Sequence, residues 1–163
     1  MYQQGDKIVY PLYGAGIIEE IIQQEFDGAV HTYYALNIPI GNLKIQISAA
    51  KTSELGVRYV LPLRNILLDL HQSIKTVLPQ PENWNVRYKQ NIERMKTGNI
   101  LDVASVYNEL LRRERSRGLS TAEKKMLTTA KQIILSELVL AMDAERNEAE
   151  DVLNSIFVTP TEN

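Results

Sequence analysis

The one tryptophan of the chain, Trp84, is followed at short spacing by the cations Arg87 and Lys89. If residues 83–97 form a helix, successive side chains are rotated by about 100° around its axis. Three apolar residues then share one stripe with the tryptophan: Tyr88, Ile92 and Met95. An apolar stripe on a helix ordinarily packs into a core. Core packing is therefore the first interpretation of Trp84.

Two features favour a second interpretation, in which the ring contacts a partner. Trp84 lies in the first turn, just after Pro79 and Pro81, where the stripe can extend past the edge of a core. Cations also flank the stripe in two rows, one with Arg87 and Arg94, the other with Lys89 and Lys96. Cations neutralise DNA phosphates. The ring can stack on an exposed base, a contact of roughly 1–3 kcal/mol, or wedge into a base step. None of this needs sequence-specific readout.

A second pair of cations, Lys124 and Lys125, falls in the first turn of a later predicted helix. Cations there oppose the helix dipole, which costs about 0.3 kcal/mol or more and indicates an anionic partner. Solubility explains the pair equally well. The net charge is −2, but Trp84 to Lys131 holds 11 Lys and Arg against 5 Asp and Glu, a net +6. Glu137 to Asn163 carries a net −6, so the total conceals a basic middle and an acidic tail.

Other chemistry is not indicated. His31 and His71 have no carboxylates at metal-ligand spacing, and the chain has no cysteine. Gly14-x-Gly16 lacks a third glycine and a following helix, which favours a turn over a phosphate loop. We therefore expect no enzyme, cofactor, metal or small-molecule substrate. No apolar run approaches the ~18 residues of a membrane span, and the start does not resemble a signal peptide, so a cytoplasmic location fits.

The elements that must position these residues fall into two parts. Residues 6–48 predict several short strands, and LKIQI (43–47) alternates apolar and polar side chains. Turns are expected at Gly14 to Gly16, at Asp27-Gly28 and at Gly41-Asn42. Several short strands within about 50 residues indicate a small, strongly bent sheet or barrel. We assign it to residues 1–60.

After Pro62 the apolar residues follow helical spacing, and about five helices are expected in residues 61–160. The second ends at Gly98 and the third at Gly118, while Ser120 and Glu123 form a capping box for the fourth. IILSELVLAM (133–142) is apolar on most sides, which predicts the most buried helix. A short last helix follows, and residues from Thr159 onward are expected to fray. The fold class is α+β.

Three stretches resemble the CarD/CdnL family of bacterial transcription regulators. The start GDKIVYPLYGAGII is similar to the opening of that family and to the polymerase-interacting domain of transcription-repair coupling factors. W-x-x-RYK-x-N (84–91) and RR-x-x-x-RGLS-x-x-EKKML (112–127) point to CarD/CdnL specifically. The resemblance covers nearly the whole chain.

The resemblance implies a Tudor-like, SH3-like barrel that docks on the β subunit of RNA polymerase. It also implies a helical domain that contacts promoter DNA at the upstream edge of the melted bubble. The family's tryptophan, which wedges into the minor groove at that fork and slows bubble collapse, corresponds to Trp84. The family's phosphate contacts correspond to Lys89 and Lys124, with Arg87 and Lys125 as neighbours.

Some positions depart from the family pattern. Gln24 and Gln46 stand where members can carry arginines toward polymerase, so those charge-assisted contacts are missing. Lys44 is a neighbour that can replace them. Val86 stands where some members have a further arginine, and Tyr13 replaces a frequent histidine. These departures bear on affinity for polymerase and DNA.

The leading hypothesis is thus a non-enzymatic transcription factor that binds RNA polymerase and promoter DNA and stabilises the open complex. The alternative is a protein–protein adaptor that binds polymerase or another partner and never touches DNA. In the alternative, Trp84 belongs to the core and the basic segment is a solvated surface.

Overall fold

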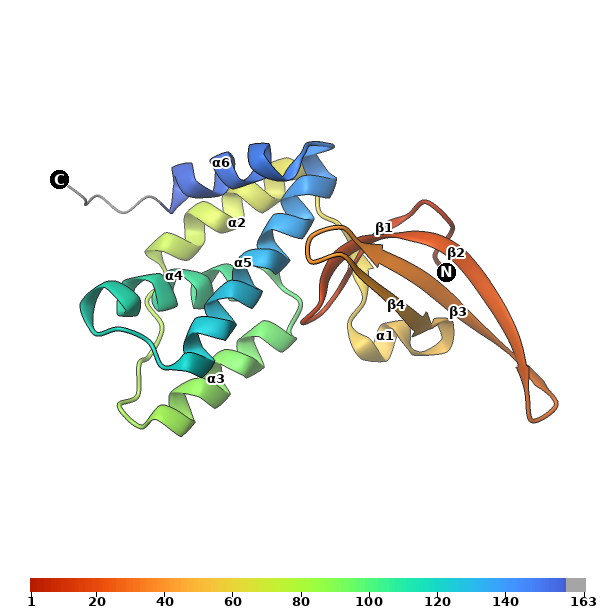
Figure 1. Ribbon diagram of the computed structural model, residues 1–163, viewed down its shortest axis with the longest axis horizontal. Coiled ribbons are helices and arrows are strands. Elements are labelled where there is room, and N and C mark those ends of the chain that lie inside the picture. Colours follow the sequence, from red (N-terminus) through yellow and green to blue (C-terminus); the bar gives the residue numbers. More distant parts are fainter. Residues whose placement is uncertain (158–163) are drawn as a thin grey trace.

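The computed structural model describes residues 1–157, and within this range five strands form one antiparallel sheet (Figure 1). Their spatial order is β4-β3-β2-β1-β5. In chain order they are β1 Lys7–Tyr10, β2 Gly14–Phe26, β3 Ala29–Ile38, β4 Leu43–Ser48 and β5 Arg58–Tyr59. The expected frayed end, from Thr159 onward, lies outside the described residues.

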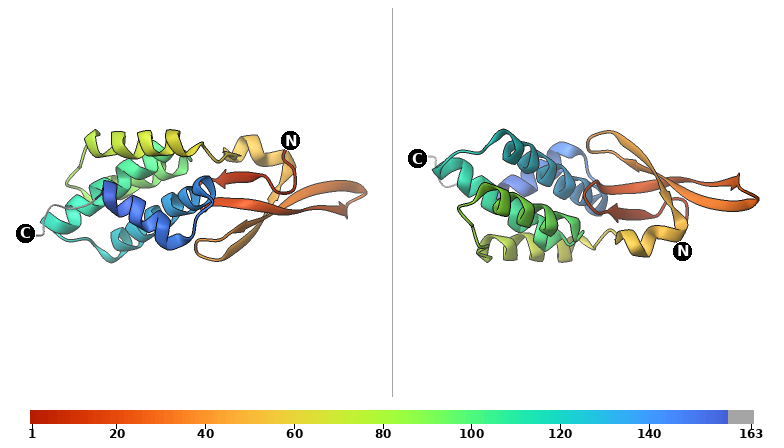
Figure 2. Two further views of the ribbon diagram at one scale, coloured as in Figure 1. Left: turned by 90° about the horizontal axis from the view of Figure 1, so that it is seen from above. Right: turned by 90° about the horizontal axis from the view of Figure 1, so that it is seen from below.

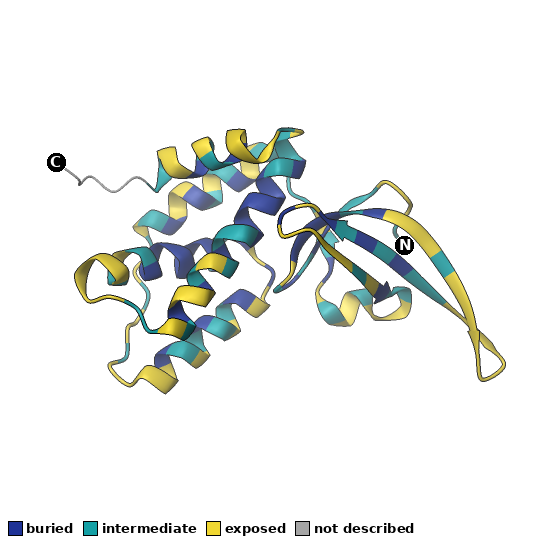
Figure 3. Cartoon of the chain, viewed as in Figure 1, coloured by how far each residue is buried: buried dark blue, intermediate teal, exposed yellow. Residues whose placement is uncertain are grey.

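The sheet is bent, but it is not closed into a barrel. Strands β4 and β5 form its two edges. A register shift between Ile18 and Glu20 marks a bulge in β2, which increases the local twist. One face buries Tyr34, Leu36 and Ile47, and the tip of the β2–β3 hairpin extends into solvent (Figure 3). The α+β class is confirmed, whereas barrel closure was not found.

The first predicted turn was misplaced. The chain reverses at residues 11–13, and Gly14 and Gly16 belong to β2. These glycines permit close approach. A Cβ at Gly14 would lie 2.8 Å from Ser136 Oγ, and one at Gly16 would lie 2.5 Å from the Asn37 carbonyl oxygen. The turns at Asp27-Gly28 and Gly41-Asn42 are confirmed.

Six α-helices follow or connect the strands in the described range. They are α1 Thr52–Leu55, α2 Leu63–Lys75, α3 Trp84–Lys96, α4 Ile100–Ser116, α5 Thr121–Met142 and α6 Arg146–Ile156. The one-turn helix α1 and the short strand β5 were not predicted. The five longer helices were, and the capping box of Ser120 and Glu123 begins α5 as expected. None of these helices is long and apolar enough to cross a membrane.

Helix α5 connects the helical bundle to the sheet (Figures 1 and 2). Its carboxyl half is buried, as predicted, because α4, α6 and β2 all pack against it. The Arg58 guanidinium donates two hydrogen bonds of 2.8 and 2.9 Å to the Glu137 carboxylate, which is 1% exposed. The backbone N–H of Ala15 donates to Ser136 Oγ at 2.8 Å. The sheet and the bundle are therefore joined by buried polar contacts.

Candidate nucleic-acid interface

Trp84 is the first residue of α3 and stands at the edge of the bundle. The helix begins here because the Asn83 side chain accepts a hydrogen bond from the backbone N–H of Val86, at 3.2 Å. Along the predicted stripe, Met95 is 1% exposed but Trp84 is 40% exposed. The Tyr88 ring stacks on the indole, with 5.1 Å between ring centroids and 15° between planes. The stripe therefore does run past the core, as expected.

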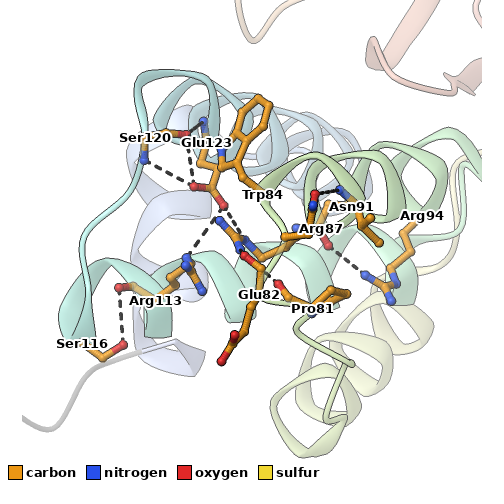
Figure 4. Close-up of polar contacts among 12 residues, drawn as sticks. Pro81, Glu82, Trp84, Arg87, Asn91, Arg94, Arg113, Ser116, Ser120 and Glu123 are labelled. Atoms are coloured by element: carbon orange, nitrogen blue, oxygen red, sulfur yellow. Dashed lines mark hydrogen bonds and ion pairs between the residues drawn. The ribbon is translucent and has the colours of Figure 1, made fainter.

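The indole is fixed by its nitrogen as well as by Tyr88. Trp84 Nε1 donates a hydrogen bond of 3.1 Å to Ser120 Oγ, the cap of α5 (Figure 4). Ser120 Oγ also accepts from the backbone N–H of Glu123 and donates to Glu123 Oε1. One edge and one face of the ring are thus held by the protein, while part of its surface is open to solvent.

Arg87 does not flank the ring as a free cation, and that expectation was wrong. Its side chain is buried, and Nε donates to Glu123 Oε2 at 3.0 Å. Its Nη1 donates to the carbonyl oxygens of Pro81 and Glu82, at 3.1 and 3.3 Å. Arg87 therefore ties the start of α3 to α5 and is not available to a phosphate in this conformation.

The Glu123 carboxylate contacts residues from both α3 and α4 as well as the cap of its own helix. Burial raises the pKa of Glu123, but hydrogen bonds from Arg87 and Ser120 outweigh burial and hold it below its ordinary value. A second guanidinium approaches the same oxygen, with Arg113 Nε 3.9 Å from Oε2. Three elements, α3, α4 and α5, therefore meet at one ionised carboxylate.

The other predicted phosphate contacts are exposed. Lys89, Lys124 and Lys125 are solvent-exposed and form no ion pair within residues 1–157. The bond between Trp84 and Ser120 brings the first turns of α3 and α5 together, so the ring and the α5 lysines lie at adjoining helix ends. Lys89 is about 7.5 Å further along α3. The positive end of the α5 dipole adds to the attraction for an anion there.

The residues expected to face polymerase share one face of the sheet, opposite to the face that buries Tyr34, Leu36 and Ile47. We call it the outer face. Gln46 is opposite Ala35, and Lys44 is opposite Asn37. Gln24 is opposite His31. His31, Ala35 and Asn37 are separated by even numbers of residues along β3, so their side chains point to the same face of the sheet. All three predicted residues are exposed, and Lys44 Nζ lies 3.8 Å from Glu19 Oε2. Gln24 lies toward the hairpin tip, away from the other two.

Three residues of the interface were missed as parts of it: Ser120, Glu123 and Arg113. The capping box was visible in the sequence, but the bonds from Ser120 and Glu123 to α3 join residues 36 positions apart. The only signal in the sequence was that a capping glutamate such as Glu123 can also pair with a cation from another helix. No group of three or more potential metal-binding side chains occurs in the described part of the chain.

Comparison with known proteins agrees with this architecture. Residues 2–61 match the model of the CarD-like/TRCF RID domain, and residues 69–154 match that of the CarD C-terminal domain. The chain is 38% identical over 142 residues to the YdeB protein of Bacillus subtilis (strain 168), a proposed transcription factor. That match covers 85% of this chain and 90% of YdeB. The chain therefore belongs to the CarD family of transcription factors, which are not enzymes.

Proposed function

We propose that this protein holds RNA polymerase through the outer face of its sheet and promoter DNA through the exposed side of Trp84. The interaction domain at residues 2–61 implies polymerase binding. Gln24, Lys44 and Gln46 are candidate contacts to the polymerase β subunit. Lys89, Lys124 and Lys125 would meet phosphates at the upstream edge of the bubble. A role in transcription also implies a location in the cytoplasm, at the nucleoid.

The observation that carries the DNA contact is the placement of the indole. A tryptophan at the first turn of a helix could have been folded back into the core. Here the ring is held at its nitrogen and on one face, yet is 40% exposed. A ring fixed before binding loses little rotamer freedom when a base or base step meets it. It can therefore oppose closing of the bubble without reading sequence.

The two contacts reinforce each other. The chain carries a net charge of −2, so its general attraction to DNA is weak. Binding to polymerase places Trp84 near the fork at a high effective concentration, which makes the second contact intramolecular. We therefore expect the isolated protein to bind DNA only weakly.

The test is the lifetime of open complexes formed with RNA polymerase after a competitor is added. Trp84→Ala should leave binding to polymerase unchanged but shorten the lifetime by about fivefold or more, because a stacking contact of roughly 1–3 kcal/mol is lost. Leu68→Ala is the control, since Leu68 is an exposed apolar residue on a different helix, α2. If both variants leave the lifetime unchanged while polymerase still binds, the adaptor function without DNA contact is favoured instead.

A further inference from the structure

A groove of about 270 Å³ lies between the carboxyl end of α4 and the segment that leads into α3. Its lining includes three arginines and two glutamates: Arg112, Arg113, Arg117, Glu82 and Glu109. The three arginines belong to the RR-x-x-x-RGLS stretch that resembles the family, but none of the groove residues is among the predicted DNA contacts. The arginines are brought together by the end of α4, where the backbone N–H groups of Arg117 and Gly118 both donate to the Arg113 carbonyl oxygen.

The cations of the groove are only partly neutralised. Arg112 Nη1 lies 3.7 Å from Glu109 Oε1, and Arg112 also donates to the Ile74 carbonyl oxygen. Arg113 Nε is buried and has no hydrogen-bond partner among the described residues. Its nearest carboxylate, Glu123, already accepts from Arg87 and Ser120. Arg117 is exposed and forms no ion pair within residues 1–157.

Spare guanidinium donors in a concave site suit an oxyanion. The planar donor fork of arginine matches phosphate and carboxylate oxygens in a bidentate manner. Small-molecule sites typically measure about 300–1,000 Å³, so this groove is small for a whole nucleotide. One phosphate group with part of its sugar fits that size better. The dipole of α4 favours cations in its last turn, but it does not explain Arg113 Nε, which is buried without a hydrogen bond and lies 3.9 Å from Glu123 Oε2.

The Glu123 carboxylate lies between the groove and the Trp84 site. Glu123 Oε1 accepts from Ser120, which holds the indole, and Oε2 lies between Arg87 and Arg113 (Figure 4). We propose that the groove binds one backbone phosphate of the DNA whose base step meets Trp84. This inference rests on the proposed function and adds a phosphate contact on the α4 side of the ring. Arg113 and Arg117 would supply the donors.

The experiment replaces single DNA phosphates near the fork with neutral methylphosphonates. For each position, the lifetime of the polymerase open complex is measured with the full chain and with Arg117→Gln. Arg117 is exposed, so its replacement should not disturb folding, and an unchanged Tm checks this. Arg115→Gln is the matched control, because Arg115 lies in the last turn of α4, two residues before Arg117, but does not line the groove.

We expect Arg117→Gln to shorten the protein-dependent lifetime by about tenfold or more, the size of one charge-assisted contact. At one phosphate position, the methylphosphonate should cause the same loss with the unaltered protein and no further loss with Arg117→Gln. Such non-additivity identifies direct partners. Arg115→Gln should keep both the lifetime and the methylphosphonate effect.

The proposal is overturned if every methylphosphonate shortens the open-complex lifetime as much with Arg117→Gln as with the unaltered protein. In that case a persisting effect of Trp84→Ala still supports the proposed function, and its absence contradicts both. Inorganic phosphate added to the isolated protein tests the other source of this anion. A rise in Tm that Arg117→Gln abolishes, without any position-specific methylphosphonate effect, would identify a free-phosphate site and also overturn the proposal.

Discussion

At the level of single residues, the buried pair of Arg87 and Glu123 determines where the exposed ring stands. The pair joins α3 to α5. Ser120 Oγ donates to Glu123 and accepts from the indole nitrogen, so the position of the ring depends on the same carboxylate. The stripe containing Trp84 was predictable because helical periodicity is local. The burial of Arg87 was not, because it depends on a carboxylate 36 residues away in the chain.

Glu123→Gln should destabilise the protein by about 3–5 kcal/mol at pH 7, because it leaves the buried Arg87 without its counter-charge. The pKa of Glu123 is lowered in the folded state. Its contribution to stability is therefore complete above the pKa of the unfolded chain and is lost as pH falls through the folded value.

Urea unfolding between pH 7 and pH 3 measures this effect. The unaltered protein should lose stability more steeply on the acid side than Glu123→Gln does. Glu114→Gln, an exposed replacement on α4, is the control and should behave like the unaltered protein. Parallel pH profiles for all three proteins would contradict the assignment.

At the level of elements, helices were easier to predict than strands. Helix ends depend on nearby residues, such as the cap Asn83 and the capping box of Ser120 and Glu123. The start of β2 instead depends on tertiary contact. Gly14 and Gly16 suggested a turn, but they allow α5 and β3 to approach the strand closely. The turn of the long hairpin was predictable from Asp27-Gly28, but the length of its strands and the open sheet edges follow from pairing that no local signal specifies.

Gly14→Ala should therefore cost more than an ordinary glycine replacement. Gly14 has φ +119°, and the new Cβ would lie 2.8 Å from Ser136 Oγ. Moving Ser136 would weaken its bond from the Ala15 N–H. We expect a loss of about 2–4 kcal/mol from backbone strain and overpacking together. Thermal unfolding gives the difference.

Gly28→Ala is the matched control for this replacement. Gly28 also has a positive φ, of +75°, but a Cβ there meets no atom within 4 Å. Its expected cost is about 1 kcal/mol, from backbone strain alone. Equal losses in the two variants would show that the contact between β2 and α5 contributes nothing.

At the level of the whole molecule, the sheet and the bundle are positioned by the Arg58–Glu137 pair. Glu137 also accepts a hydrogen bond from the backbone N–H of Leu61 at 3.0 Å, in the segment that connects the two parts. This arrangement fixes the distance between the outer face of the sheet and the exposed ring. A fixed distance raises the effective concentration of the second contact only if it matches the span on polymerase and DNA.

Arg58→Ala should leave polymerase binding intact and shorten open-complex lifetime, because the buried Glu137 loses its counter-charge and the contact between the parts loosens. Small-angle X-ray scattering should show a wider distribution of shapes. Arg64→Ala, an exposed replacement on α2, should change neither measurement. An unchanged scattering profile for Arg58→Ala would show that the remaining contacts suffice.

The single indole of the chain has an optical consequence. Intrinsic emission excited at the red edge of the absorption band comes from this one ring, with no second tryptophan to dilute the signal. Its environment in the free protein combines a tyrosine face, a serine oxygen and water. Arrival of a nucleobase would quench the emission directly, so occupancy of the ring can be followed in real time without attaching a dye.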